Sequence, residues 1–146
     1  MTESASYKNF RANVIKQGDR IDRVENIRIV GMPDINGCID GVEFWIEMKA
    51  PKKEPKRPTT PLLGSAHNLS QDQINWFDRQ RRAAGNAYLL IVTDRRWLLL
   101  GGSFASIVNK MTVAQMIDNA VFTAEKPVNK ELWGFLRTAL ARKVQP

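Results

Sequence analysis

The first apolar pattern along the chain has the spacing of a helix. In residues 7–17, Tyr7, Phe10 and Val14 follow one another at intervals of three and four, which places them on one face of an α-helix. Gly18 favours the end of this helix, because glycine readily adopts the backbone conformations found just after a helix. The pattern therefore predicts a helix that packs one face on a core.

The next segments alternate between apolar and polar positions, as strands do. Residues 21–30 carry isoleucines on one side and predict a half-buried strand. Residues 33–39 and 42–49 flank Asp40-Gly41, a dipeptide that suits a two-residue hairpin turn of type I′. Three antiparallel strands in succession are therefore expected.

The regular pattern breaks down in residues 50–69, which contain four prolines and one glycine. Loops of this length inside a compact domain are usually functional or disordered. The segment follows Lys49 directly and is basic, with Lys52, Lys53, Lys56 and Arg57. We call it the basic loop and expect it to lack regular structure.

A second periodic region follows the basic loop. Residues Ser70–Ala84 have helical spacing and end before Gly85. The continuous apolar run over 87–93 is typical of a strand covered on both faces, and 97–100 would be its neighbour. Two further helices are expected, Thr112–Val121 and Asn129–Lys143.

Together these elements predict one α/β domain over residues 1–146, with a core at about 7–100 and a C-terminal helical part at about 103–146. Its mixed sheet would contain a three-strand antiparallel meander and further strands, flanked by helices. No segment has the ~18 uninterrupted apolar residues of a membrane helix, and the first residues do not resemble a signal peptide. We therefore expect a cytoplasmic protein without a membrane partner.

The charge of the chain suits a polyanion. It has 22 Lys and Arg against 15 Asp and Glu, a net charge of +7. Nucleic acid fits this charge, although basic domains also bind membranes or acidic proteins. Cys38 is the only cysteine and His67 the only histidine, which leaves too few soft ligands for zinc. A metal would therefore be bound by oxygen.

The predicted hairpin brings two carboxylates together. Counting outward from Asp40-Gly41 places Asp34 opposite Glu47, with Cβ atoms about 4.5 to 5.5 Å apart on one face of the sheet. Their repulsion would be relieved by Mg²⁺, which binds carboxylates, waters and phosphate oxygens. Lys49 lies on the same face two residues later, where its ammonium could orient a metal-activated water and offset charge in the transition state.

Pro33-Asp34, followed after the hairpin by Glu47–Lys49, resembles the PD-(D/E)xK nuclease motif. The resemblance is narrower to the VRR-NUC branch, which includes small phage members, in three segments: Gly31–Asp34, Phe44–Lys49 and Leu69–Gln73. It covers about residues 20–93 and implies a restriction-endonuclease-like core. If a phage encodes the chain, the expected location is the cytoplasm of the host cell.

The resemblance also assigns roles to residues. It implies that Asp34 and Glu47 bind Mg²⁺, for which Mn²⁺ would substitute, and that Lys49 assists hydrolysis. In isolation, Asp34 fits a turn residue after proline, and Glu47 with Lys49 fits a solvated strand face. Their joint spacing and the flanking family segments favour the site.

Two supporting residues have more than one interpretation. The family places a glutamine on the helix after the lysine strand, which best matches Gln73, to support the site or the scissile strand. Ser70 and Gln73 also fit a capping box, in which both side chains bind backbone groups instead.

The family further has an acidic residue ahead of the Asp, often on the first helix. Residues 7–17 contain none, so Glu25 is the candidate.

We expect the substrate to be DNA, held through its phosphates without regard to sequence. The candidate contacts are Lys52, Lys53, Lys56 and Arg57 of the basic loop, with Arg79 and Arg82 of the following helix. The alternatives without a function are an inert linker for the loop and a solvated helix face for the arginines.

The predicted function is hydrolysis of DNA phosphodiesters by a magnesium-dependent endonuclease. Because one site cuts one strand, a homodimer or higher oligomer would serve for double-strand or junction cleavage. A Holliday-junction resolvase, a sequence-specific homing-type endonuclease and a nuclease of flaps or single strands remain open as alternatives. Outside the enzyme class, a non-catalytic DNA-binding module and a protein that binds RNA or acidic proteins also remain open.

Overall fold

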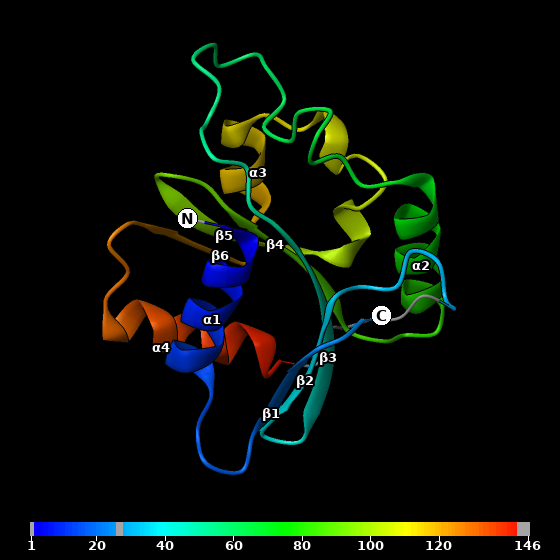
Figure 1. Cartoon of the computed structure of the whole chain (residues 1–146), viewed down its shortest axis with the longest axis vertical. Helices are drawn as coiled ribbons and strands as arrows, with labels where there is room; N and C mark the ends of the chain where they lie inside the picture. Colours follow the sequence, from blue (N-terminus) through cyan, green and yellow to red (C-terminus); the bar gives the residue numbers. More distant parts are fainter. Residues whose placement is uncertain (1, 26–27, 143–146) are drawn as a thin grey trace.

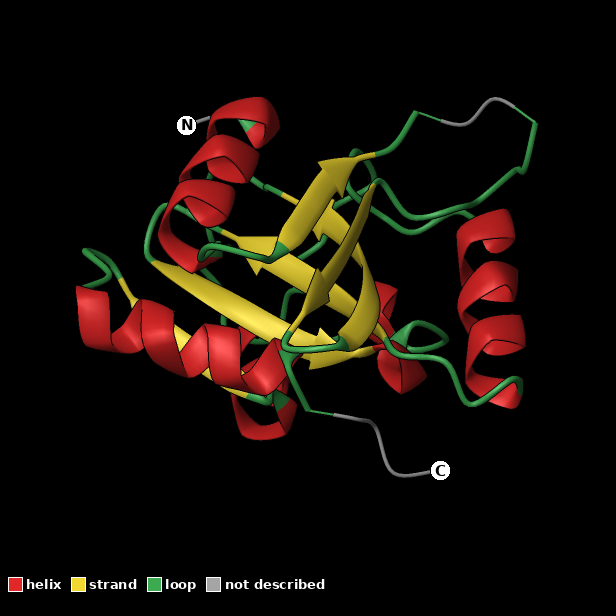
Figure 2. Ribbon diagram, turned by 90° about the horizontal axis from the view of Figure 1, so that it is seen from below, coloured by secondary structure: helices red, strands yellow, loops and turns green. Residues whose placement is uncertain are grey.

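The computed structural model describes residues 2–25 and 28–142, which form a six-stranded mixed sheet with helices on both faces (Figures 1 and 2). The strands are β1 (Arg20–Arg23), β2 (Ile35–Ile39), β3 (Val42–Lys49), β4 (Ala87–Val92), β5 (Arg96–Gly101) and β6 (Phe122–Glu125). The helices are α1 (Glu3–Val14), α2 (Gln71–Arg82), α3 (Val113–Asn119) and α4 (Lys130–Leu140), with two 3₁₀ turns, η1 (Gly102–Phe104) and η2 (Val108–Lys110). The predicted α/β class is confirmed.

The strands lie in chain order across the sheet, and β3 and β4 form the parallel pair among otherwise antiparallel neighbours. The first three strands are therefore the predicted antiparallel meander. The parallel step requires a long crossover, which the basic loop and α2 supply. All six residues of β4 are buried, as the continuous apolar run predicted.

The hairpin between β2 and β3 has the predicted turn and register. Asp40 and Gly41 have φ angles of 51° and 80°, as both central residues of a type I′ turn require. The ladder from this turn ends with Ile35 opposite Ile46. Since side chains alternate between the faces of a strand, this register fixes which residues of β3 enter each core.

The sheet separates two hydrophobic cores. On one face, Phe44, Ile46 and Met48 of β3 pack with α1 and α4, for example with Phe10 and Leu136. The opposite face packs against α2, α3 and the basic loop, through Phe77, Met116, Leu62 and Leu63 among others. Both faces of the sheet are therefore covered, so a functional site is expected where the strands end.

The first helix lies closer to the N-terminus than predicted, and it ends at Val14 rather than at residue 17. It begins at Glu3 rather than at Tyr7, and its N-cap Thr2 accepts a hydrogen bond from the backbone of Ala5. The buried stripe of the helix includes Ser6 before Phe10. Because Ser6 is polar but occupies a core position, the pattern of apolar residues did not predict the first turn of the helix.

The predicted strand over 21–30 is wrong in its second half. β1 ends at Arg23, and Ile29 and Val30 are exposed at 46% and 65%. Ile27, on the same predicted face, lies outside the described residues. The reason is that the ladder between β1 and β2 ends with the pair of Arg23 and Ile35, where β2 begins.

The C-terminal region contains a strand that the sequence pattern did not predict. In β6, Phe122 and Ala124 are buried while Thr123 and Glu125 are exposed. This alternation is confined to four residues, too few to distinguish from a loop in the sequence. The two predicted C-terminal helices are present as α3 and α4, with ends shifted by a few residues. Within the described ranges, no helix has the length and apolar character needed to cross a membrane.

The basic loop lacks regular structure, as predicted, but it is anchored at several points. Leu62 and Leu63 are buried in the second core. The backbone of Leu69 exchanges two hydrogen bonds with the Asn109 side chain, of 2.8 and 2.9 Å. Glu54 accepts a hydrogen bond of 2.8 Å from Arg96 Nε. The exposed stretch 56–61 is therefore held on both sides.

Candidate active site

The hairpin register brings Asp34 and Glu47 to the same end of the sheet. Because Ile35 lies opposite Ile46, the next position along both strands places Asp34 beside Glu47. Asp34 Oδ1 accepts a hydrogen bond of 3.2 Å from the backbone N–H of Met48, which ties it to β3. The two carboxyl groups are close enough for the charge of Asp34 to raise the pKa of Glu47.

Both carboxyl groups are held where their ionised forms are unfavourable. Burial raises the pKa of Asp34 to about 6, although the hydrogen bond from Met48 favours its ionised form. Burial and the neighbouring charge of Asp34 raise the pKa of Glu47 to about 8, against the opposing effect of Lys49. Glu47 is only 6% exposed. The pair therefore needs protons or a cation at neutral pH.

Lys49 supplies one cation beside the pair. Its Nζ lies 3.5 Å from Glu47 Oε2, and the side chains are 14% and 8% exposed. This proximity follows from the two-residue period of β3, which puts both side chains on one face. The structure therefore brings the three central predicted residues, Asp34, Glu47 and Lys49, into one cluster.

Glu3, which the sequence analysis missed, also acts on this cluster. Its negative charge raises the pKa values of both Asp34 and Glu47. It lies in the first turn of α1, 3.8 Å from Arg23 through Oε1 and Nη2. The signal that could have found it is the capping residue Thr2 followed by an acidic first turn, which marks a helix start.

Glu25 lies two residues beyond the end of β1 and is exposed. Its neighbour Val24 donates a backbone hydrogen bond of 2.7 Å to the carbonyl of Asp34. Glu25 is therefore near the pair along the chain, and its role in the site stays a prediction. Glu3 fits the expectation of an acidic residue on the first helix better.

Gln73 takes part in the capping box that was its alternative interpretation. Its Oε1 accepts a hydrogen bond of 2.9 Å from the backbone of Ser70, whose Oγ accepts one of 3.2 Å from the backbone of Gln73. The first turn of α2 nevertheless touches the segment before Asp34. A Cβ at Gly31, which has φ +83°, would lie 2.3 Å from the Asp72 carbonyl oxygen. Support of the site by Gln73 stays a prediction.

The chemistry of the donors fits a hard cation. Two buried carboxyl groups of raised pKa present oxygen ligands, which is the set that Mg²⁺ or Mn²⁺ prefers. Over residues 2–25 and 28–142, no three His, Cys, Asp or Glu side chains are already arranged to hold a metal. Any metal would therefore be bound by the pair and by ligands from outside it, or after a movement of Glu3.

The predicted DNA contacts lie on two separate segments. Lys52, Lys53, Lys56 and Arg57 are all exposed, and the first of them follows Lys49 by three residues. On α2, Arg79 and Arg82 are exposed, and Arg82 forms an ion pair of 2.9 Å with Asp78. The loop residues therefore adjoin the acidic pair along the chain, whereas the arginines belong to the covering helix.

The architecture is an α/β fold of the restriction-endonuclease-like kind. Among solved structures, the chain is similar to Hjc of Archaeoglobus fulgidus, a Holliday junction resolvase from an archaeal hyperthermophile. The TM-score is 0.55 at 17% identity, over 78% of this chain and 91% of that chain. At this identity the likeness shows the fold and confirms the predicted core. No family model matches the sequence, and no curated protein is significantly similar to it.

Proposed function

We propose that the protein is a metal-dependent endonuclease of the PD-(D/E)xK type that hydrolyses DNA phosphodiesters, with branched DNA as its preferred substrate. The observation that carries the proposal is the buried cluster of Asp34, Glu47 and Lys49, in which two neighbouring carboxyl groups have raised pKa values and the Lys49 ammonium pairs with Glu47. The preference for branched DNA is supported by the likeness to Hjc, a Holliday junction resolvase. The assignment to the VRR-NUC branch is the finer part of the proposal and rests on the motif residues alone.

Asp34 and Glu47 would hold the metal, and Glu3 would add a third carboxylate. Bound Mg²⁺ would supply charge to polarise the phosphoryl group and to activate water. The protein's own contribution is to keep the two carboxyl groups buried and adjacent, so that their charge is available to a cation rather than to solvent. Their raised pKa values mean that binding a cation displaces protons.

Lys49 would stabilise the charge that develops on the phosphate oxygens. Its ammonium is mostly buried and paired with Glu47 at 3.5 Å, so its position is fixed before substrate arrives. A preorganised cation in a site of low water content stabilises a developing anion more than a solvated one does. Because it is buried, Lys49 would be the residue that stabilises negative charge in the transition state.

The basic loop would hold the DNA strand at this edge of the sheet. Its four exposed cations suit phosphate contacts, which bring affinity without sequence preference. The anchors at Glu54 and Leu62 limit the movement of the exposed segment between them. Arg79 and Arg82 would extend the contacts along α2.

The proposal is tested by incubating purified protein with four-way junctions, duplex, flap and single-stranded DNA, with Mg²⁺ or with EDTA. We expect cutting with Mg²⁺, most rapidly on the junction, and none with EDTA. Asp34→Ala should bind the junction but not cut it. Tight binding with no metal-dependent cutting of any substrate would show a DNA-binding module instead.

A further inference from the structure

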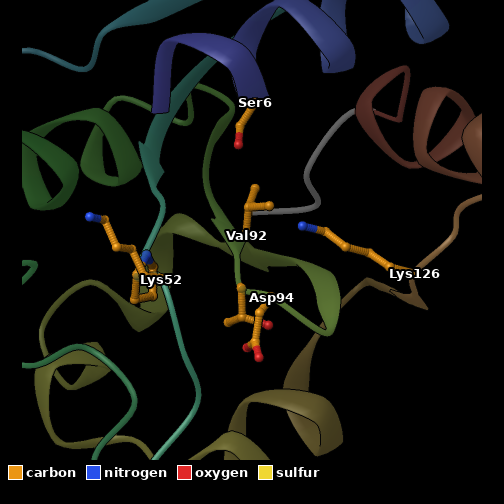
Figure 3. A pocket seen from close by; sticks show the side chains of 7 residues that line it. Ser6, Lys52, Val92, Asp94 and Lys126 are labelled. Carbon is orange, nitrogen blue, oxygen red and sulfur yellow. The ribbon is translucent and has the colours of Figure 1, made fainter. Parts of the chain in front are cut away.

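A small polar pocket lies at the ends of β3 and β4 (Figure 3). Its volume is about 60 Å³, which is room for roughly four water-sized groups. The lining residues are Ser6, Pro51, Lys52, Val92, Thr93, Asp94 and Lys126. Since β3 and β4 are parallel, their carboxyl ends reach this edge together, and α1 closes the pocket from one side.

Ser6 is the unusual residue of this pocket. It is fully buried, and its Oγ is the buried side-chain polar atom that has no hydrogen-bond partner in residues 2–25 and 28–142. In Figure 3 the hydroxyl points from α1 into the pocket. A buried hydroxyl without a partner is unfavourable, so the position calls for a polar group from outside the chain.

The charges around the pocket favour an anion as that group. The side chain of Lys126 reaches toward Val92 in Figure 3, while Lys52 lines the opposite wall with its ammonium directed outward. The one acidic lining residue, Asp94, accepts a hydrogen bond of 3.2 Å from the backbone of Glu54. Its carboxylate is directed away from Ser6 in Figure 3. The Ser6 hydroxyl and the Lys126 ammonium are therefore the groups that face the pocket.

The pocket is closely connected to the acidic cluster along the chain. Ser6 lies one helical turn, about 5 Å, after Glu3 on α1. Pro51 follows Lys49 by two residues on the other side. The pocket and the acidic cluster thus lie on segments that adjoin along α1 and after β3.

We propose that Ser6 and Lys126 form a subsite for a non-scissile backbone phosphate, one or two nucleotides from the bond that is cut. The proposal deepens the nuclease function and rests on it. The Ser6 hydroxyl would donate a hydrogen bond to a phosphate oxygen, and the Lys126 ammonium would neutralise its charge.

The test uses a four-way junction in which single phosphates are replaced, one at a time, by neutral methylphosphonates. Binding is measured in EDTA for the unmodified protein, Ser6→Ala and Lys126→Gln. We expect one position near the cut where the replacement weakens binding of the unmodified protein by about tenfold, as the loss of one charge-assisted hydrogen bond would. In Lys126→Gln the penalty at that position should disappear, because the charge contact is already lost, and in Ser6→Ala it should become smaller, because one of the two contacts is lost.

Lys130→Gln is the matched control, since Lys130 is an exposed lysine of α4 outside the pocket. It should keep the penalty at the same phosphate. Ser6→Ala should melt at the same temperature as the unmodified protein or higher, because it removes only an unpartnered hydroxyl. The subsite is overturned if Lys126→Gln keeps the full penalty, or if Lys130→Gln removes it. If the unmodified protein cuts no DNA but the variants still change the methylphosphonate penalty as expected, the subsite stands and only the proposed hydrolysis is refuted.

Discussion

At the scale of single residues, the site is defined by two carboxyl groups that the fold makes difficult to ionise. The folded-state pKa values of Asp34 and Glu47 lie above their ordinary values of 3.8 and 4.5. The folded protein therefore keeps protons that the unfolded chain has released between about pH 4 and pH 8. Over this range the pair makes the free energy of unfolding fall as the pH rises.

The double variant Asp34→Asn with Glu47→Gln should therefore be more stable than the unmodified protein at pH 8 in EDTA. We expect a gain on the order of 2 to 4 kcal/mol that is much smaller at pH 4 and vanishes near pH 3, where the carboxyl groups are protonated in both states. Denaturant unfolding at several pH values measures it. Glu25→Gln, an exposed carboxyl group, is the control and should change little. A gain that is the same at pH 4 and pH 8 would contradict the assigned shifts.

Lys49 contributes to the same cluster by its charge. Lys49→Ala should lower the rate of cutting by about 100- to 1,000-fold, the usual effect of removing one preorganised stabiliser of transition-state charge. Binding of uncut DNA should change little, because the ammonium is mostly buried beside Glu47. Lys53→Ala provides the opposite control, since this exposed loop lysine should affect binding and its salt dependence more than the rate. Equal rate losses in both variants would remove the special role of Lys49.

At the scale of elements, the start of α1 decides which acidic residue completes the site. Glu3 raises the pKa values of the pair and is held near Arg23, whereas Glu25 is exposed beyond β1. Glu3→Gln should raise the Mg²⁺ concentration needed for half-maximal cutting by roughly 10- to 100-fold, as the loss of a supporting ligand does. Glu25→Gln should leave it unchanged. A larger effect at Glu25 would restore the assignment expected from the sequence.

One of the anchors of the basic loop is a buried ion pair. Glu54 and Arg96 have side chains 9% and 14% exposed, and the Thr93 hydroxyl donates a hydrogen bond of 2.7 Å to the same carboxylate. Arg96→Met should lower the free energy of unfolding by about 3 kcal/mol, because it leaves a buried carboxylate without its cation. Trypsin should then cut the loop faster after Lys56. Arg95→Met changes the exposed neighbouring arginine and should do neither.

At the scale of the whole molecule, the sequence predicted the parts governed by short, periodic rules. The turn at Asp40-Gly41 fixes the count of residues along both strands, so the order of the residues predicts the ladder as far as Ile35 opposite Ile46, with Asp34 and Glu47 as the next residues beyond it. The buried strand β4 and the capping box at Ser70 were predicted for a similar reason, since each depends on residues close together in the sequence.

The features that escaped prediction depend on contacts distant along the chain. Ser6 occupies a core position on α1, so the apolar pattern began a turn too late and Glu3 was overlooked. Ile29 belongs to an alternating pattern that predicted a strand, but it lies outside the sheet, because the β1–β2 ladder ends where β2 begins, at Ile35. The subsite of Ser6 and Lys126 joins residues from α1 and the end of β6, which no local pattern connects.

The last prediction concerns the number of copies that act together. A four-way junction is resolved by two cuts in opposing strands, and under the proposed function one Asp34–Glu47 site would cut one strand. A homodimer with two sites related by two-fold symmetry would make both cuts during one encounter. We therefore propose that two copies of the chain act on each junction, and mixing unmodified protein with Asp34→Ala tests this.

In an equal mixture that has exchanged subunits, only about a quarter of dimers carry two active sites, so paired cuts should fall to about a quarter. The total number of strand breaks, each of which needs one active site, should fall only to about half on a substrate in excess, and the share of plasmids with a single nick should rise. A cruciform plasmid distinguishes the outcomes, since paired cuts linearise it and single nicks relax it. If paired cuts decline in proportion to the unmodified protein, each copy acts alone. Sedimentation of the mixture before the reaction verifies that the variant assembles like the unmodified chain.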